Sequence, residues 1–160
     1  MILGMTTLTF VHVLLSLAGI ASGVIVALGM LASKRLDGLT AVFLATTVLT
    51  SVTGFFFPYE GFKPSYVVGV LSLIVLAIAI FARYSRHSAG GWRRTYVITS
   101  VIALYLNVFV LVVQLFEKVP ALKAMAPTQS EPPFKLAQLV VLALFVMLGI
   151  FAAIRFRVEA

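Results

Sequence analysis

Cysteine is absent from this 160-residue chain, and charged side chains make up only 11% of it. Without cysteine the chain has no disulfide framework, no thiolate metal site and no cysteine nucleophile. A soluble domain carries about a quarter charged residues, and here the 62% of hydrophobic residues come in long blocks. Because backbone groups in hydrocarbon need internal hydrogen bonds, such blocks favour helices. We therefore expect an all-α polytopic membrane protein.

Acidic residues are also scarce: the chain has five, and none falls in the middle of an apolar block. An ionisable side chain inside the membrane usually marks a proton or ion pathway, so a carrier with a midplane carboxylate is disfavoured. The remaining polar residues form no Ser-His-Asp arrangement, no Gly-rich phosphate loop and no set of metal ligands at the usual spacing. We predict no catalytic residues and no metal site.

Five apolar blocks are long enough to cross a bilayer, which requires roughly 20 residues each. They predict one domain over residues 1–160 that is a bundle of five transmembrane helices, at residues 8–32, 39–57, 66–82, 96–116 and 136–154. The N-terminus lacks the basic residues of a secretory signal. We therefore expect the first block to be an uncleaved helix.

The basic residues are divided unequally between the two ends of these helices. If the N-terminus is outside, the inner side holds Lys34, Arg35, Arg83, Arg86, Arg93, Arg94, Arg155 and Arg157, and the outer side holds Lys63, Lys118, Lys123 and Lys135. Cytoplasmic loops carry the excess of Lys and Arg, so we expect the C-terminus in the cytoplasm and the protein in a bacterial inner membrane. Basic residues placed in this way are a topology signal, and we predict no nucleic-acid partner.

Small residues recur along the first predicted helix. Ser16, Gly19, Gly23 and Ala27 form a stripe that contains a GxxxG motif, which is typical of close helix–helix contact. The contact lies either within the chain or between two copies of it. In the second helix, hydroxyl side chains gather on two adjoining faces, at Thr46, Thr47, Thr50, Ser51 and Thr53. They either bond to carbonyls one turn back or line a polar path.

The two histidines restrict any haem. His12 lies near the outer end of the first helix and His87 near the inner side, about 30 Å apart across the bilayer core. One chain therefore cannot place both rings on one haem. We predict no cofactor, with a single-histidine haem, a haem shared by two copies, or a quinone near His12 as alternatives.

The segment from Asn107 to Gln138 gathers amides, carboxylates, lysines and prolines in a chain that is otherwise apolar. Three proline positions stiffen its connection, and residues 121–126 are expected to form one short amphipathic turn at the membrane surface. Topology places a candidate binding cluster on the same outer side: His12, Tyr59, Glu60, Asn107, Gln114, Glu117, Glu131 and Gln138. The alternative is that the amides only hydrogen-bond to neighbouring helices.

These observations favour a small, non-enzymatic membrane subunit that binds a partner protein, a lipid or a hydrophobic ligand at its outer face. A membrane protein partner or a homo-oligomer is expected. One alternative is a small-solute transporter or channel made by oligomerisation, with the hydroxyls of the second helix along its path. The other is a membrane redox protein that holds haem or quinone near His12.

Overall fold

A computed structural model of the chain describes residues 7–32, 34, 36–56, 64–85, 91–127 and 131–155. Its elements are α1 (Thr7–Leu31), α2 (Asp37–Gly54), α3 (Pro64–Ile80), the π-helical turn η1 (Phe81–Ser85), α4 (Gly91–Lys118), α5 (Pro120–Met125) and α6 (Pro132–Arg155). The described part of the chain contains no strand. This confirms the all-helical prediction.

Among the described residues, four segments are long and apolar enough to cross a membrane: Phe10–Leu31, Val67–Tyr84, Gly91–Val113 and Pro132–Arg155. The second helix is shorter, with an apolar stretch of Gly38–Gly54. At 1.5 Å per residue, the 18 residues of α2 extend ~27 Å, slightly less than the ~30 Å thickness of a hydrocarbon core.

Several helices are longer than their apolar blocks. Helix α4 begins at Gly91, before the predicted 96, and α6 begins at Pro132, before the predicted 136. Proline is well accommodated in the first turn of a helix, where its missing N–H would have no intrahelical partner. Hydropathy locates the boundary of the hydrocarbon, whereas helical hydrogen bonding continues past it into the polar interface.

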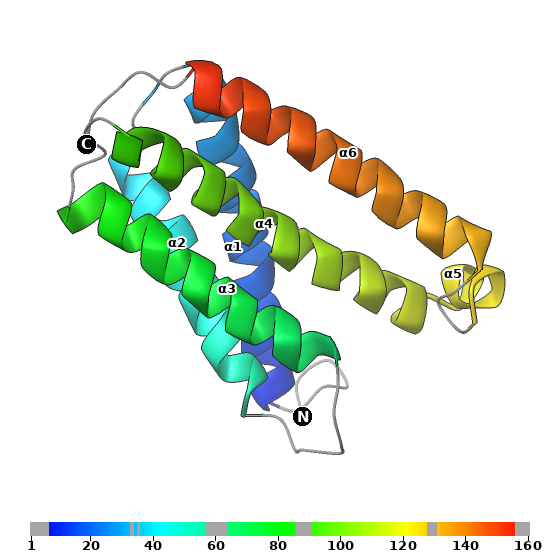
Figure 1. Ribbon diagram of the computed structural model, residues 1–160. Helices are drawn as coiled ribbons and strands as arrows, with labels where there is room; N and C mark the ends of the chain where they lie inside the picture. The colour runs from blue at the N-terminus through cyan, green and yellow to red at the C-terminus, as the bar shows by residue number, and fades with distance from the viewer. Residues whose placement is uncertain are drawn as a thin grey trace.

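The helices separate into two arms (Figure 1). One arm contains α1, α2 and α3, and the other contains α4, α5 and α6. Helices α1, α2 and α3 pack side by side, and α4 packs against α1 and α3. Helix α6 runs along α4 and touches α1. The arms meet at the end where α4 begins and α6 finishes, and they diverge toward the other end, where α5 joins α4 to α6.

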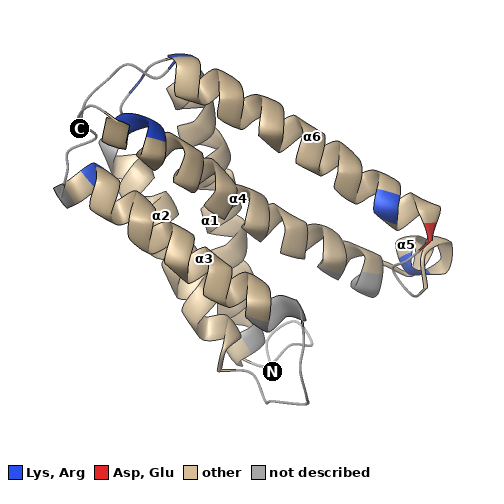
Figure 2. Cartoon of the chain, in the orientation of Figure 1, with Lys and Arg blue, Asp and Glu red and all other residues tan. Residues whose placement is uncertain are grey.

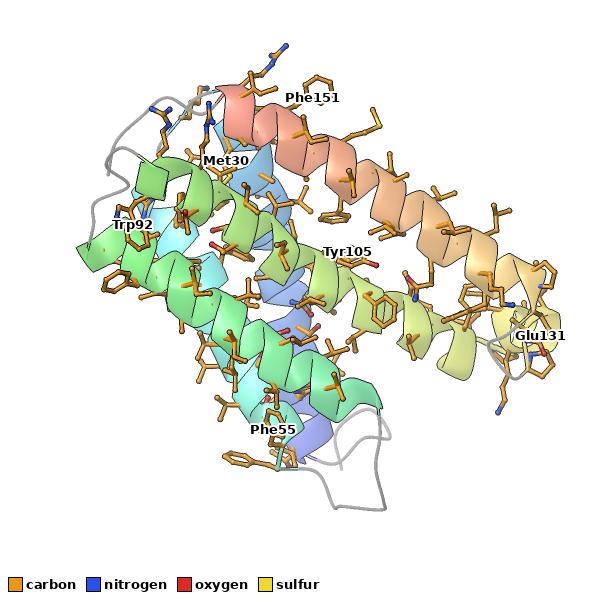
Figure 3. The ribbon with its side chains drawn as sticks, viewed as in Figure 1. Met30, Phe55, Trp92, Tyr105, Glu131 and Phe151 are labelled. Carbon is orange, nitrogen blue, oxygen red and sulfur yellow. The ribbon has the colours of Figure 1, made fainter. Side chains whose placement is uncertain are left out.

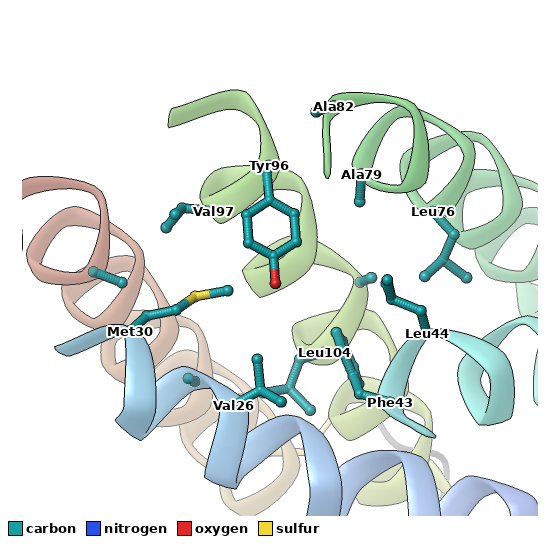
Figure 4. Packing of buried hydrophobic residues seen from close by; sticks show 13 residues of the cluster. Val26, Met30, Phe43, Leu44, Leu76, Ala79, Ala82, Tyr96, Val97 and Leu104 are labelled. Atoms are coloured by element: carbon teal, nitrogen blue, oxygen red, sulfur yellow. The ribbon is translucent and has the colours of Figure 1, made fainter. Parts of the chain in front are cut away.

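The buried core lies in the half of the bundle where the arms meet. Figure 4 shows Tyr96 of α4 pointing between Met30 of α1 and the side chains of α2, with Phe43 and Leu104 below it. All four of these side chains are at most 2% exposed. This apolar layer separates the end of the molecule that holds most of the described arginines from the opposite end (Figure 2).

The small-residue stripe of α1 packs within the chain. A Cβ at Gly23 would lie 2.7 Å from Leu104 Cδ1 and 2.8 Å from Phe43, and one at Gly19 would lie 3.0 Å from Thr47 Oγ1. At these two positions the side chains of α2 and α4 lie so close to α1 that they would have to shift to admit a Cβ.

This contact generates a stability prediction. We expect Gly23→Ala to lower the free energy of unfolding by about 1–3 kcal/mol, because the added methyl group overpacks a site that is already full. Gly38→Ala is the matched control, since no atom lies within 4 Å of the Cβ position there. Unfolding of both variants in detergent micelles measures the difference. Equal stability of Gly23→Ala and wild type would show that α1 is not held this closely.

Candidate functional site

A polar cavity of about 90 Å³ lies between α1, α2, α3 and α4, beyond the apolar core. Its polar lining comes from all four helices: His12, Ser16, Thr47, Thr50, Ser51, Ser72 and Asn107. The remaining wall is apolar and includes Phe55, Gly69 and Leu106. In a bundle built mainly from aliphatic side chains, this is a concentration of hydrogen-bonding groups.

Helical periodicity explains how these residues reach one place. His12 and Ser16 are one turn apart on α1, on the face that continues into Gly19 and Gly23. Thr47 and Ser51 are one turn apart on α2. Small residues bring α1 close to both α2 and α4. On the adjacent turns of α1, His12 and Ser16 therefore face side chains of α2 and α4 across a short gap.

Asn107 of α4 is held by α1. Ser16 Oγ donates to Asn107 Oδ1 at 3.0 Å, and Asn107 Nδ2 lies 3.5 Å from the Ser16 carbonyl oxygen. The Asn107 side chain is buried, at 8% exposed. A buried amide in an apolar environment is costly unless it is bonded, so this pair fixes both the register of α1 on α4 and one wall of the cavity.

His12 is oriented by the end of α2. Its Nδ1 lies 2.8 Å from Thr53 Oγ1, and Thr53 Oγ1 donates to the Leu49 carbonyl at 2.8 Å. Nδ1 of His12 and the Thr53 hydroxyl therefore share one hydrogen bond, and the tautomer of the ring decides which of the two donates.

Most hydroxyls of α2 bond to their own helix. Thr46, Thr50 and Ser51 donate to carbonyls one turn back at 2.6, 2.7 and 3.0 Å, as the packing interpretation of the sequence expects. Thr47 is different. Its side chain is 2% exposed, and its Oγ1 has no hydrogen-bond partner among the described residues, although it borders the cavity.

The chemistry of this lining is neutral hydrogen bonding. It offers hydroxyls, one amide and one imidazole, and none of its described members is a carboxylate, lysine or arginine. A charged ligand would be desolvated there without a counter-charge, which is expensive in hydrocarbon. No group of three His, Cys, Asp or Glu among the described residues could hold a metal ion. The cavity therefore suits a small neutral group with carbonyl or hydroxyl oxygens.

An aromatic ring closes one side of the cavity. A Cβ at Gly69 of α3 would lie 2.9 Å from Cζ of Phe55, so the ring at the end of α2 packs directly over this glycine. Phe55 is 39% exposed. The ring forms an apolar edge between the polar lining and the outside of the bundle.

The structure brings together two members of the predicted outer-face cluster, His12 and Asn107. Gln138 lies elsewhere, between α6 and α4, where its Nε2 donates to the Phe109 carbonyl at 3.4 Å. Glu131 sits where α5 meets α6, at a separate corner of the molecule from Phe55 (Figure 3). Tyr59 and Glu60 lie outside the described residues, as do the side chains of Gln114 and Glu117 on α4.

Two residues of interest were not singled out by the sequence patterns. Ser72, 5% exposed, contributes a hydroxyl to the cavity from the middle of α3. Its only signal is that it is an isolated polar residue in an apolar block. Arg83 follows the predicted helix 66–82, but the π-helical turn η1 carries the helix further, and Arg83 is only 3% exposed. Its guanidinium lies 5.2 Å from the Tyr96 ring and 5.7 Å from the Tyr84 ring.

Fold and site together define a helical membrane-type bundle with a neutral polar cavity in one half. No protein-family model, curated protein or solved structure shows detectable similarity to the chain.

The Ser16–Asn107 pair provides a direct test of how α1 and α4 are joined. In a double-mutant cycle of Ser16→Ala and Asn107→Leu, we expect a coupling free energy of about 1 kcal/mol, within the range measured for hydrogen bonds between membrane helices. Unfolding of the four proteins in bicelles supplies the cycle. The same cycle with Thr95→Val in place of Ser16→Ala is the control, because Thr95 bonds to the Gly91 carbonyl, twelve residues from Asn107 along α4. Additive effects of the Ser16 and Asn107 variants would contradict the pairing.

Proposed function

We propose that this protein is a non-enzymatic membrane subunit that binds a small, neutral, lipid-soluble ligand in the cavity between α1, α2, α3 and α4. The observation that carries the proposal is the convergence of polar side chains from four helices on one cavity, including the buried Thr47 hydroxyl that has no described partner. Polar groups are costly in hydrocarbon unless they are bonded. A ligand with carbonyl or hydroxyl oxygens supplies the missing bonds.

A quinone ring is the ligand class that best matches this lining. Its oxygens accept hydrogen bonds from hydroxyls such as Thr47, and its flat apolar ring suits a wall that includes Phe55 and Leu106. The ring carries no charge, so it needs no counter-charge in the cavity. A porphyrin is too large for a volume of about 90 Å³, so the geometry favours quinone over haem near His12.

Transport is the competing function, and one observation supports it: Thr47, Thr50 and Ser51 of α2 all line the cavity. Toward the arginine-rich end, however, the route meets the apolar layer formed by Phe43 and Leu104, which are 1% exposed. This layer favours a closed binding site over a continuous path.

The expected topology is five spans, with the N-terminus outside and the arginine-rich end in the cytoplasm of a bacterial inner membrane. Helix α2 is short, but it lies against both α1 and α3, which favours a full crossing. Arg83 lies in η1, Arg93 and Arg94 at the start of α4 and Arg155 at the end of α6, whereas Lys123 lies in α5 and Lys135 at the start of α6. Figure 2 shows basic residues at both of these ends of the bundle. Positive residues are enriched on the cytoplasmic side.

Ligand binding is tested with a short-tailed benzoquinone and the protein in lipid nanodiscs. We expect wild type to bind it and Thr47→Val to bind it about 2- to 10-fold more weakly, which is the effect of one hydrogen bond. Thr46→Val is the matched control, since this neighbouring hydroxyl bonds to Val42 and is outside the cavity lining. No binding by wild type, or equal losses in both variants, would refute the quinone site.

Topology is tested with single cysteines, for which the natural absence of cysteine gives a clean background. We expect a membrane-impermeant maleimide to label Ser130→Cys in intact cells and to label Ser88→Cys only after permeabilisation. Thr6→Cys should behave like Ser130→Cys, because four of the five expected spans lie between these two positions and return the chain to the same side. Labelling in the reverse pattern would invert the orientation.

A further inference from the structure

A long apolar groove runs along the seam between α4 and α6, on a different part of the molecule from the polar cavity. Its volume is about 560 Å³. Aliphatic and aromatic side chains line nearly all of it, among them Ile98, Tyr105, Phe145 and Val146. Among the described residues of its lining, the single charged one is Arg94, in the first turn of α4. We propose that this groove binds one anionic phospholipid, with its phosphate on Arg94 and an acyl chain along the seam.

The length of the groove matches one leaflet of a bilayer. Arg94 and Tyr105 are eleven residues apart on α4, which corresponds to ~16 Å along the helix axis. Half of a hydrocarbon core is ~15 Å thick. The lining therefore begins with a cation at the membrane interface and ends near the midplane, where the Tyr105 ring contacts the rings of Phe109 and Phe145, with centroids 6.2 and 5.7 Å away. A charged end followed by an apolar channel matches the head group and acyl chain of a phospholipid in the leaflet at the arginine-rich end.

The floor of the groove lies where α4 and α6 come together. A Cβ at Gly149 would be 3.6 Å from Val101 Cγ1, an ordinary contact distance, so the helices touch there. Val146 and Ile150 of α6 are 52% and 54% exposed, and they form a wall against which a flexible chain can lie.

Charge complementarity selects the head group. Arginine binds phosphate through two parallel N–H···O bonds, and basic sites between helices on the cytoplasmic side are suited to anionic lipid head groups. Arg155, at the end of α6, is also exposed and lies at the same end of the bundle (Figure 2). A zwitterionic lipid would bring an additional positive charge toward these arginines.

The same arginines disfavour a second copy of the chain in the groove. Two copies inserted in the same orientation would place their Arg94 side chains in the same leaflet, and a symmetric contact through this seam would bring like charges together. A lipid phosphate instead compensates the cation. A dimer joined at α4 and α6 is therefore an outcome of the test that contradicts the proposal.

The experiment measures retained lipid by native mass spectrometry, with the protein released from nanodiscs that contain equal amounts of phosphatidylglycerol and phosphatidylcholine. We expect wild type to retain one phosphatidylglycerol in preference to phosphatidylcholine. Arg94→Gln should reduce that preference about fivefold, the effect of one basic residue at a membrane surface. Lys123→Gln, a charge-matched change in α5 at the opposite end, should leave it unchanged.

A second variant tests the acyl-chain half of the site. Val146→Trp places a large side chain in the groove and should reduce retention of both lipids, whereas Leu144→Trp, at another exposed position of α6 (59%) outside the lining, should not. The proposal is overturned if wild type shows no preference for phosphatidylglycerol, or if Arg94→Gln preserves that preference. It is also overturned if Val146→Trp and Leu144→Trp retain equal amounts, or if the protein leaves the nanodisc as a lipid-free dimer.

Discussion

The close approach of α1 to α2 and α4 is the contact on which the rest of the structure depends. Gly19 and Gly23 leave so little space that a methyl group at either position would crowd Thr47, or Phe43 and Leu104. In a membrane, where lipid tails are as apolar as leucine, helices associate through such close packing and through interhelical hydrogen bonds. The same approach places Ser16 against Asn107 and so builds one wall of the polar cavity. The close contacts that hold these helices together therefore also form the cavity.

The bundle keeps its two kinds of polar chemistry apart. Hydroxyls, an amide and an imidazole meet in a neutral cavity at one end, and most of the described arginines lie at the other. The apolar layer of Met30, Phe43, Tyr96 and Leu104 separates them. Where a cation does enter the bundle, at Arg83, it lies over the Tyr96 ring, an arrangement that stabilises a desolvated guanidinium. Each end therefore presents different chemistry: neutral hydrogen-bonding groups at one, and arginine side chains at the other.

Helix α6 is exposed along almost its whole length. Only Ala152 is fully buried along its 24 residues, which would be untenable in water but is ordinary where lipid covers the helix. What distinguishes its seam with α4 from the rest of that surface is the combination of a continuous groove with a single cation at one end. The seam is a candidate site because it has a positive charge at one end and apolar side chains along the rest. The size of its apolar area alone would not distinguish it.

The amino-acid sequence by itself determined the helical class and the approximate positions of the long apolar segments, because bilayer thickness and backbone hydrogen bonding impose both locally. It also identified the α1 stripe and the polar character of His12 and Asn107. Only the tertiary structure decided that the stripe packs within the chain, that Ser72 and Thr47 join His12 and Asn107, and that Gln138 and Glu131 lie apart from them. Those outcomes depend on how α4 and α6 diverge from the other helices, and crossing geometry arises from contacts between residues far apart in sequence, which helical periodicity does not encode.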